Sequence, residues 1–291
     1  MQPSPLSKII LDGRVFFVKR DDLIDPYLAG NKYRKLYTFL QTPKEKFHTI
    51  LSYGGTQSNA MLAIAAMCHQ KGWHFTYYTK PLSRKQKESP CGNYKHSLEL
   101  GMEHIEIGQE LYRDFIASLA VVQNEGTFLI EQGGAVKEAA LGLEVLAEEL
   151  REQLKNDEFK SVKAVATPSG TGTTAFFLAV ALPEFKIYTT PCVGDVEYLK
   201  KQMRSFGEIP KNLMILKPKK KYHFAKPYKE FYGLYKKLKN AGIEFDLLYA
   251  PGMWQALLEQ TDEQVLYIHS GGVSGNESML QRLSISTFFK N

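Results

Sequence analysis

The chain has 291 residues, of which 44% are hydrophobic and 23% are charged. These proportions are ordinary for a globular protein and leave room for two modest domains. No apolar run approaches the roughly 20 residues that a membrane-spanning helix needs, and the N-terminal stretch lacks the basic-then-apolar order of a secretion signal. We therefore expect a cytoplasmic protein that has no membrane partner.

The three cysteines, Cys68, Cys91 and Cys192, are far apart and form no CxxC or other metal-ligand spacing. The sequence thus predicts neither a disulfide framework nor a metal site. Buried or idle thiols are expected instead.

Part of the net charge of +6 is concentrated in a basic and aromatic segment, residues 217–240. A segment of this kind could bind nucleic acid. Within it, however, Phe231, Leu234, Tyr235 and Leu238 recur at helical spacing, which predicts an amphipathic helix over 227–238 whose lysines face solvent. Nucleic acid is therefore a disfavoured partner, and the hypothesis stays open to a binding test.

Strand-like runs alternate with helical patterns from end to end, which predicts an α/β fold. Asp12-Gly13, a favoured tight-turn pair, predicts a hairpin at the start. Asn31 is expected to cap a helix that begins at Lys32, because Gly30 breaks the preceding structure. The pattern then predicts strands at 47–53, 73–79, 103–107 and 127–131, and helices at 58–72, 93–101 and 111–126. The helix residues 60–68 are almost wholly apolar, so we expect them to be buried.

The second half predicts a long helix at 136–154, a strand at 162–166 and an apolar helix at 175–182. Further strands are predicted at 186–193, 245–250 and 264–272, each followed by or ending in a turn with Gly or Pro. Because α/β proteins bind ligands at the carboxyl ends of parallel strands, several of these ends are expected to converge on one site.

A loop rich in glycine and threonine, residues 167–174, precedes the apolar helix. Its backbone N–H groups and the positive end of the helix dipole predict a cradle for an anion such as a phosphate. The loop lacks the GK[ST] ending of a nucleotide P-loop and does not match GxGxxG, which disfavours ATP and NAD.

Lys32 lies in the stretch AGNKYRKL, residues 29–36, a short way before the polar stretch SYGGTQSN, residues 52–59. A lysine beside a flexible glycine and a polar loop suits an imine with an aldehyde cofactor.

Four motifs, AGNKYRKL, SYGGTQSN, SGTGTT and HSGG, occur in the same order as those of pyridoxal-phosphate enzymes of the tryptophan synthase β-like (fold type II) superfamily. The chain more closely resembles the branch that contains 1-aminocyclopropane-1-carboxylate deaminase and D-cysteine desulfhydrase. The resemblance implies two domains, each an open, mostly parallel sheet flanked by helices, with the cofactor in the cleft between them. It implies a large domain of residues 1–42 plus 133–291, a small domain of residues 43–132, and a homodimer.

The resemblance also implies the roles of individual residues. Lys32 looks like the lysine that forms a Schiff base with the cofactor and later moves protons, and Asn59 is similar to the asparagine that bonds the ring hydroxyl. Gln57 and Ser58 would receive the substrate carboxylate, while Ser58 could either abstract a proton or cap the following helix. Tyr249 would lie near the substrate. The phosphate cup would consist of Gly170, Thr171, Gly172, Thr173 and Thr174. His269 is expected to support its loop rather than to bind a metal.

The chain departs from the family pattern at Ala250, where relatives usually carry a glutamate or threonine that faces the pyridine nitrogen. An alanine can neither donate a hydrogen bond nor supply charge, which leaves the partner of that nitrogen open. The missing glutamate argues against cyclopropane ring opening. A further departure is Ala60, where relatives often carry histidine.

The sequence therefore predicts a pyridoxal-phosphate-dependent lyase or deaminase for a small amino acid. A D-cysteine desulfhydrase-like β-elimination to pyruvate, ammonia and sulfide is the most economical reaction. The alternatives are a 1-aminocyclopropane-1-carboxylate deaminase-like hydrolase and a catalytically impaired homologue that binds cofactor or amino acid. The handedness of the substrate and the proton-abstracting group stay open.

Overall fold

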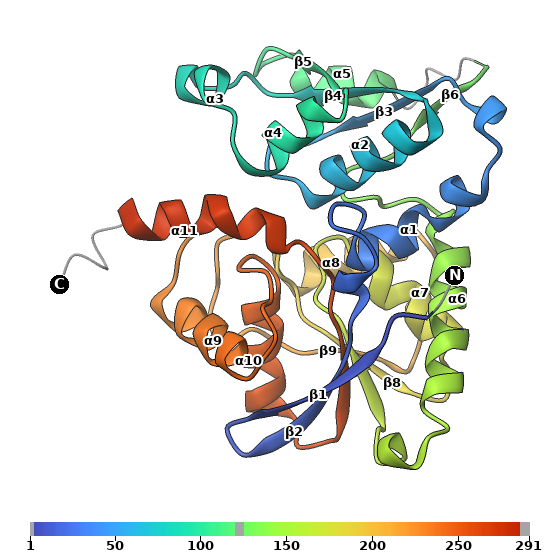
Figure 1. Cartoon of the computed structure of the whole chain (residues 1–291), viewed down its shortest axis with the longest axis vertical. Coiled ribbons are helices and arrows are strands. Elements are labelled where there is room, and N and C mark those ends of the chain that lie inside the picture. The colour runs from blue at the N-terminus through green and yellow to red at the C-terminus, as the bar shows by residue number, and fades with distance from the viewer. Residues whose placement is uncertain (1–2, 120–124, 286–291) are drawn as a thin grey trace.

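The computed structural model describes residues 3–119 and 125–285. It contains two sheets flanked by helices, with the smaller sheet above the larger one in Figure 1. The predicted α/β fold is confirmed. Part of the predicted helix at 111–126 lies outside the described residues, and the part that is described forms helix α5 (Tyr112–Leu119).

The larger sheet has six strands in the order β1-β2-β10-β7-β8-β9. β1 and β2 form the predicted antiparallel hairpin, and both Asp12 and Gly13 have positive φ angles, as a tight hairpin turn requires. All other neighbours in this sheet pair in parallel, so their carboxyl ends lie at one edge. The strands are β1 (Leu6–Leu11), β2 (Arg14–Lys19), β7 (Ala164–Ala166), β8 (Lys186–Thr189), β9 (Leu213–Ile215) and β10 (Val265–Ile268).

The smaller sheet has four parallel strands in the order β5-β4-β3-β6. Tyr77 and Tyr78, neighbours on β4, point to opposite faces of the sheet. Tyr77 packs into the core that includes α2, whereas the Tyr78 ring contacts Phe115 of α5, with ring centroids 4.9 Å apart. The strands are β3 (Thr49–Tyr53), β4 (His74–Thr79), β5 (Glu103–Glu106) and β6 (Thr127–Leu129). The helices of this part are α2 (Asn59–Lys71), α3 (Arg84–Glu88), α4 (Gly92–Glu99) and α5.

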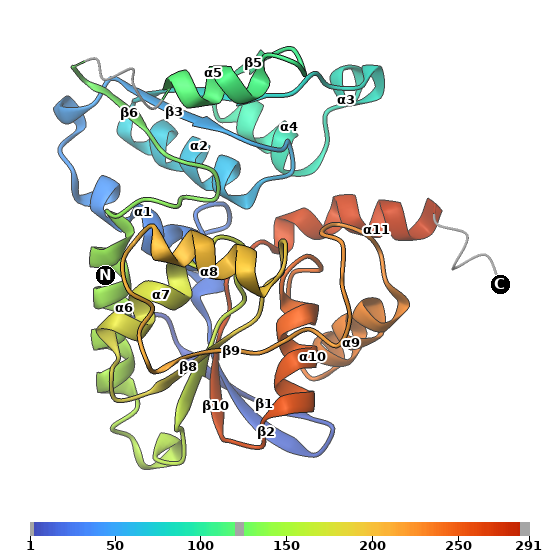
Figure 2. The same ribbon diagram turned by 180° about the vertical axis from the view of Figure 1, so that it is seen from behind.

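Both faces of the larger sheet are covered at its centre, which explains why the inner strands β7 and β10 are continuously apolar and buried. Phe17 belongs to the core beneath α6 (Ala139–Gln153) and α7 (Thr173–Ala181), while its neighbour Phe16 packs with Trp254 on the other face. The other helices of this part are α8 (Val196–Arg204), α9 (Lys229–Asn240), α10 (Ala250–Gln260) and α11 (Asn276–Ile285). Figure 2 shows α7 and α8 from behind.

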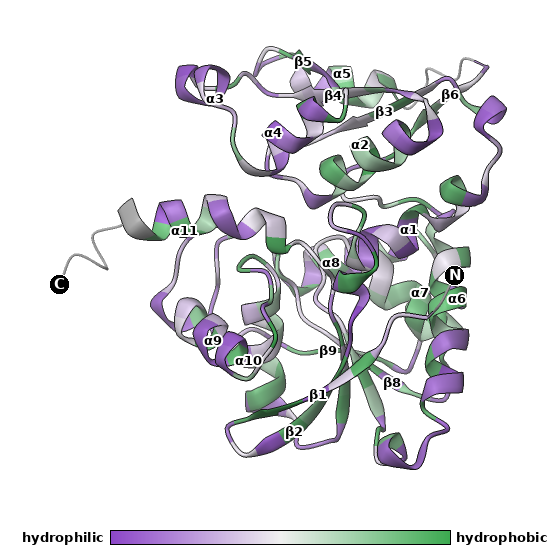
Figure 3. Cartoon of the chain, in the orientation of Figure 1, coloured by the Kyte–Doolittle hydropathy of each residue, from purple (hydrophilic) through white to green (hydrophobic). Residues whose placement is uncertain are grey.

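Helix α1 (Gly30–Gln41) and helix α2 lie at the junction of the two parts, where α1 contacts both α2 and α6. The predicted burial of residues 60–68 on α2 is confirmed, because all nine side chains are buried. Short 3-10 turns complete the described structure: η1 (Asp21–Leu23), η2 (Lys44–Lys46), η3 (Asp157–Phe159) and η4 (Val273–Gly275). In Figure 3, α2 and α7 are mostly hydrophobic, whereas α3 is hydrophilic.

Two local predictions are wrong. Residues 245–249 form no strand but a bend, and α10 already begins at Ala250, because the Asp246 carboxylate accepts hydrogen bonds from the backbone N–H groups of residues 248, 249 and 250. Asn31 caps no helix, because α1 already begins at Gly30 and the Asn31 side chain donates to Thr174 Oγ1 at 3.2 Å. The sequence predicts none of the elements α3, α8, α10, α11 and β9.

The basic segment, residues 217–240, contains the predicted amphipathic helix as α9, with Tyr235 and Leu238 buried. Several of its lysines form ion pairs within the chain: Lys219 with Glu259, Lys220 with Glu230, Lys237 with Asp12 and Lys239 with Glu244. These pairs reduce the positive field that a nucleic acid would meet.

The three cysteines are free thiols, and no group of three His, Cys, Asp or Glu side chains within 3–119 and 125–285 is placed to hold a metal ion. No helix in the same ranges is long and apolar enough to cross a membrane.

Candidate active site

The start of α1 is fixed by a close approach between two backbone segments. Gly30 has φ +61°, and a Cβ added there would lie 2.1 Å from the carbonyl carbon of Ser270. The next backbone N–H, that of Asn31, donates to the Ser270 carbonyl at 3.3 Å. Only glycine fits this position, so the helix that carries Lys32 begins directly against the loop after β10.

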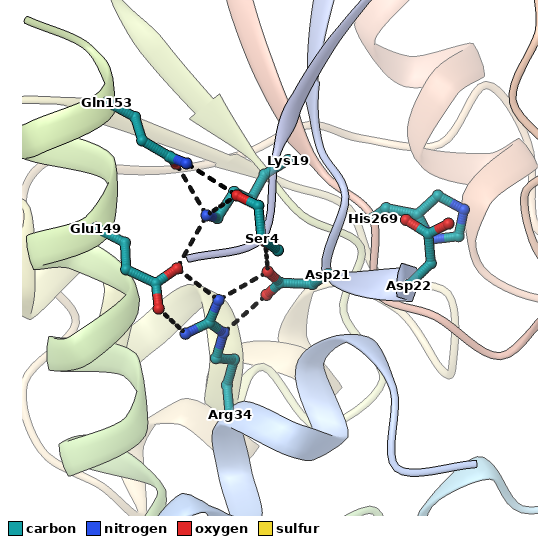
Figure 4. A network of polar contacts seen from close by, with 8 residues as sticks. All are labelled: Ser4, Lys19, Asp21, Asp22, Arg34, Glu149, Gln153 and His269. Atoms are coloured by element: carbon teal, nitrogen blue, oxygen red, sulfur yellow. Dashed lines mark hydrogen bonds and ion pairs between the residues drawn. The ribbon is translucent and has the colours of Figure 1, made fainter. Parts of the chain in front are cut away.

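A buried ionic network anchors the same helix to the larger sheet (Figure 4). The Arg34 guanidinium forms paired hydrogen bonds with Asp21 and Glu149 at 2.7–2.9 Å. Lys19, at the end of β2, contacts Glu149 at 2.9 Å. Burial opposes the charge on Arg34, but the two carboxylates raise its pKa above the ordinary value. The network therefore links β2, α1 and α6 and holds the helix of Lys32 in place.

The Lys32 amine lies inside a cavity of about 480 Å³ and donates to Asn31 Oδ1 at 3.0 Å. Burial lowers the pKa of Lys32 from 10.5 to about 8, although nearby Asp246 opposes the change. At pH 7 such a change increases the neutral fraction of the amine roughly 300-fold. Lys32 is thus prepared to act as a nucleophile toward a carbonyl carbon.

The glycine- and threonine-rich loop connects β7 to the start of α7, as predicted. Gly170, Thr171, Gly172, Thr173 and Thr174 all line the cavity. The hydroxyls of Thr171 and Thr173 lie 2.8 Å apart, and α7 begins at Thr173 with its N-terminal N–H groups toward the loop. This is the donor set that a phosphate group requires.

A second lysine, Lys35, was not recognised from the sequence as part of the site. It is 3% exposed, lines the cavity and donates to the Gly133 carbonyl at 3.0 Å. Gly133 adjoins Thr171, since a Cβ at Gly133 would lie 3.3 Å from the Thr171 methyl carbon. Burial, and then the nearby Lys32, place the pKa of Lys35 well below its ordinary value. The spacing of three residues on one helix was the available sequence signal, because it puts both lysines on the same face.

The stretch before α2 contributes Gln57, Ser58 and Asn59 to the cavity. Ser58 caps α2, with its Oγ accepting from the Met61 N–H at 3.3 Å, so the expected capping contact exists. The Gln57 side chain is fixed in its orientation, because its amide nitrogen donates to the Cys91 carbonyl and its amide oxygen accepts from the Asn93 N–H.

The Asn59 amide is oriented by a residue that the sequence did not reveal. Asn93 is fully buried, and its Nδ2 donates to Asn59 Oδ1 at 2.8 Å. With its oxygen engaged, Asn59 presents its Nδ2 as the free donor. Gly272, which has φ +84°, leaves the room for that amide, since a Cβ there would lie 2.3 Å from Asn59 Nδ2.

Tyr249 reaches the cavity from the turn before α10, and Asp246 fixes that turn by accepting from the Tyr249 N–H at 2.6 Å. Burial raises the pKa of Tyr249, so its phenol stays protonated at neutral pH. Ala250 is fully buried and is not among the residues that line the cavity. Ser270, which follows β10, also lines the cavity, and the sequence did not identify it as a site residue.

His269 supports its loop, as expected. Its Nδ1 accepts from the Gly271 N–H at 3.1 Å, so the ring donates through Nε2 to the Glu244 carbonyl at 2.9 Å. Asp22 lies 3.9 Å from the same ring (Figure 4).

All ten candidate residues of the sequence thus line one cavity: Lys32, Gln57, Ser58, Asn59, Gly170, Thr171, Gly172, Thr173, Thr174 and Tyr249. They come from both parts of the molecule. The nucleophilic amine, the amide donor and the anion cradle fit the aldehyde, ring hydroxyl and phosphate of pyridoxal phosphate.

Comparison with known proteins gives one family. A family described as "Pyridoxal-phosphate dependent enzyme" matches residues 2–196. A putative 1-aminocyclopropane-1-carboxylate deaminase from Thermotoga maritima is 27% identical over 292 aligned positions, covering 92% of this chain and 91% of the relative. A D-cysteine desulfhydrase from Klebsiella pneumoniae is 27% identical over 59% of this chain and 54% of its own.

Solved structures share the fold. A crystal structure of a 1-aminocyclopropane-1-carboxylate deaminase homologue has a TM-score of 0.75 and 20% identity, covering 97% of this chain and 94% of that one. A hydrogen sulfide-producing enzyme from Fusobacterium nucleatum has a TM-score of 0.62 and 14% identity, covering 93% and 96% of the two chains.

Proposed function

From the premise that this chain belongs to the family of pyridoxal-phosphate-dependent enzymes, we propose that it is a lyase or deaminase for a small amino acid. The preferred reaction is a D-cysteine desulfhydrase-like β-elimination, in which D-cysteine and water give pyruvate, ammonia and hydrogen sulfide. The convergence of Lys32, Asn59 and the Gly170–Thr174 loop on one cavity carries the proposal. We also propose that the two sheets mark two domains, residues 43–132 and residues 1–42 plus 133–291.

Pyridoxal phosphate, when bound, supplies an aldehyde that takes up an amine and a ring that withdraws electrons from the bonds at the α-carbon. Lys32 would hold the aldehyde and, once a substrate amine displaces it, would move the α-proton. Asn59 would donate to the ring hydroxyl. The Gly170–Thr174 loop would hold the phosphate, and the proposed positive partner of that phosphate is Lys35.

The substrate carboxylate would lie at Gln57 and Ser58, where the positive end of the α2 dipole favours an anion. Since Ser58 already caps α2, we propose that it positions the carboxylate rather than abstracting a proton. Tyr249 would contact the substrate from the opposite side, as a protonated hydroxyl.

The side facing the ring nitrogen favours elimination over ring opening. Ala250 is buried away from the cavity, which leaves the Ser270 hydroxyl as the proposed partner of the nitrogen. A hydroxyl carries no charge and cannot stabilise a proton on that nitrogen as a carboxylate would. Weaker electron withdrawal suits a substrate with a good leaving group, such as a thiol on the β-carbon, better than an unactivated cyclopropane.

The test has a binding arm and a turnover arm. Wild-type protein, Lys32→Ala and the exposed-lysine control Lys46→Ala are mixed with pyridoxal phosphate, reduced with borohydride and analysed by mass spectrometry for the attachment site. We expect attachment at Lys32 in wild type and control. Attachment that persists in Lys32→Ala would refute the assignment.

In the turnover arm, both enantiomers of cysteine, serine and alanine, and 1-aminocyclopropane-1-carboxylate, are assayed for 2-oxo acid, ammonia and sulfide. Pyruvate and sulfide in equal amounts from D-cysteine would support the preferred reaction. A four-carbon 2-oxo acid from the cyclopropane substrate would favour the deaminase alternative. Cofactor attachment without any product would favour a catalytically impaired homologue.

A further inference from the structure

We propose that Arg282 selects amino acids whose side chain carries a second anionic group, a carboxylate or a phosphate. The inference rests on the general form of the proposed function, a pyridoxal-phosphate-dependent lyase or deaminase for a small amino acid. It names a substrate class for the same cavity that is an alternative to D-cysteine, whose side chain carries a neutral thiol. It also makes Arg282, at the mouth of the cavity, a specificity-determining residue of this chain.

The cavity has an excess of positive charge. Lys32, Lys35 and Arg282 line it, and none of the lining side chains in the described part of the chain is an aspartate or glutamate. Lys32 is the proposed partner of the aldehyde, and Lys35 that of the phosphate. The α-carboxylate has the N-terminus of α2. Neither the cofactor nor the α-carboxylate of an amino acid therefore provides an anion for Arg282.

The position of Arg282 on α11 points it toward the same space as two other lining residues. Arg282 lies four positions after Ser278 and three positions after Met279, so its side chain is on the same face of α11 as theirs. That face lines the cavity. Because Lys32 and Arg282 line one continuous cavity, a substrate attached at the Lys32 end can extend toward Arg282.

The guanidinium of Arg282 keeps most of its donors available. It donates to the Ala225 carbonyl at 3.3 Å, and no carboxylate within 3–119 or 125–285 forms an ion pair with it. The nearby lysines differ, since Lys219 and Lys220 are paired with Glu259 and Glu230. A guanidinium offers five donors in a planar fork that fits a carboxylate or a phosphate.

Arg282 is exposed as a residue, so its guanidinium is accessible to a ligand that enters the cavity from solvent. Phe224, next to its partner Ala225, has its ring 5.3 Å from the Tyr249 ring, and both rings line the cavity. A ligand that fills the cavity would displace water, and charge-assisted hydrogen bonds are stronger where water is displaced.

The experiment compares nearly isosteric ligands that differ in side-chain charge. Isothermal titration calorimetry on cofactor-loaded protein measures aspartate against asparagine, glutamate against glutamine, and phosphoserine against serine, for both enantiomers. The proteins are wild type, Arg282→Met, Arg282→Lys and the control Lys221→Met. The control removes an exposed charge from the loop that contains Ala225, the partner of Arg282, and Lys221 does not line the cavity. Product release from each ligand is measured in parallel.

For wild type we expect the anionic member of at least one pair to bind about tenfold or more tightly than its neutral counterpart. Arg282→Met should abolish this preference, Arg282→Lys should keep part of it, and Lys221→Met should keep it in full. The carboxylate and phosphate pairs separate the two kinds of anion.

Three results would overturn the proposal: no preference in wild type, an equal loss of affinity for both members of each pair in Arg282→Met, or the same loss in Lys221→Met. The second result would mean that Arg282 binds the α-carboxylate or stabilises the loop of Ala225. The third would mean that the preference comes from the overall positive charge near the cavity and not from Arg282. Cofactor loading is read separately from its absorbance. Loading without anionic preference refutes Arg282 alone, whereas absence of loading refutes the proposed function and, with it, this inference.

Discussion

Replacing Lys35 with methionine tests whether this buried lysine is the counter-charge of the cofactor phosphate. Lys35 is 3% exposed, and its amine donates to the Gly133 carbonyl. The amine has no carboxylate partner in the part of the chain that the structure describes. Methionine is similar in length and suits an apolar environment. The variant therefore removes the amine that would carry the counter-charge once the phosphate is bound, and it preserves the packing of α1.

The size of the effect follows from the contact that is lost. A hydrogen bond to a charged group contributes about 1.5–3 kcal/mol, which corresponds to roughly 10- to 150-fold in the dissociation constant for pyridoxal phosphate. Pyridoxal, which lacks the phosphate, should bind the variant and the wild type equally. The comparison of the two ligands separates the contribution of the phosphate contact to affinity from a general loss of cavity structure.

The assay is a fluorescence or absorbance titration of both ligands into wild type, Lys35→Met and the exposed control Lys137→Met. An equal loss of affinity for pyridoxal and pyridoxal phosphate would refute the reasoning, because it would show that Lys35 supports the cavity as a whole. Unchanged affinity for both ligands would show that the loop and the α7 dipole hold the phosphate alone.

The same lysine makes the stability of the cofactor-free protein depend on pH. Burial lowers the folded-state pKa of Lys35, while the unfolded chain keeps a value of about 10.4. Between these values the unfolded state binds more protons, so stability rises with pH. Lys32 acts with the same sign between about pH 8 and 10.5. In urea denaturation from pH 7 to 10, Lys35→Met should be more stable than wild type at pH 7 and should gain less on alkalinisation; an identical slope would contradict this account.

Three further substitutions probe the framework of the site. Arg34→Met should cost about 3–5 kcal/mol of unfolding free energy, because the buried Asp21 loses its ion-pair partner and Glu149 keeps only Lys19; a loss below 1 kcal/mol in urea would exclude that role. Gly30→Ala should lose folded, cofactor-binding protein in size-exclusion and absorbance measurements, since its Cβ would lie 2.1 Å from Ser270; normal cofactor affinity would show that the loop can move. Ser58→Ala should lower stability by about 1 kcal/mol through the lost cap of α2, and turnover should fall through a raised KM; a collapse of kcat alone would instead assign Ser58 to proton transfer.

The sequence predicted most elements because local rules and tertiary packing agree in them. The Asp12-Gly13 turn, the apolar α2 and every strand of the two sheets except β9 follow from turn chemistry and hydrophobic periodicity. The prediction failed at residues 245–250, where an apolar run resembles a strand. There a single carboxylate, Asp246, bonds the backbone N–H groups that a strand would need for pairing. Alternation of residue types carries no information about such a contact.

The sequence by itself determined the chemical groups of the proposed site: the amine of Lys32, the amide of Asn59 and the loop 170–174, which is proposed to bind the phosphate. These could be recognised because each depends on a short stretch whose residue types and order serve one chemistry. Only the tertiary structure decided which further groups join them. Lys35, Asn93, Ser270 and Arg282 are brought to or behind the cavity from α1, α4, the end of β10 and α11. Their role arises from burial and from contacts between residues distant in sequence, and neither property is written in a local pattern.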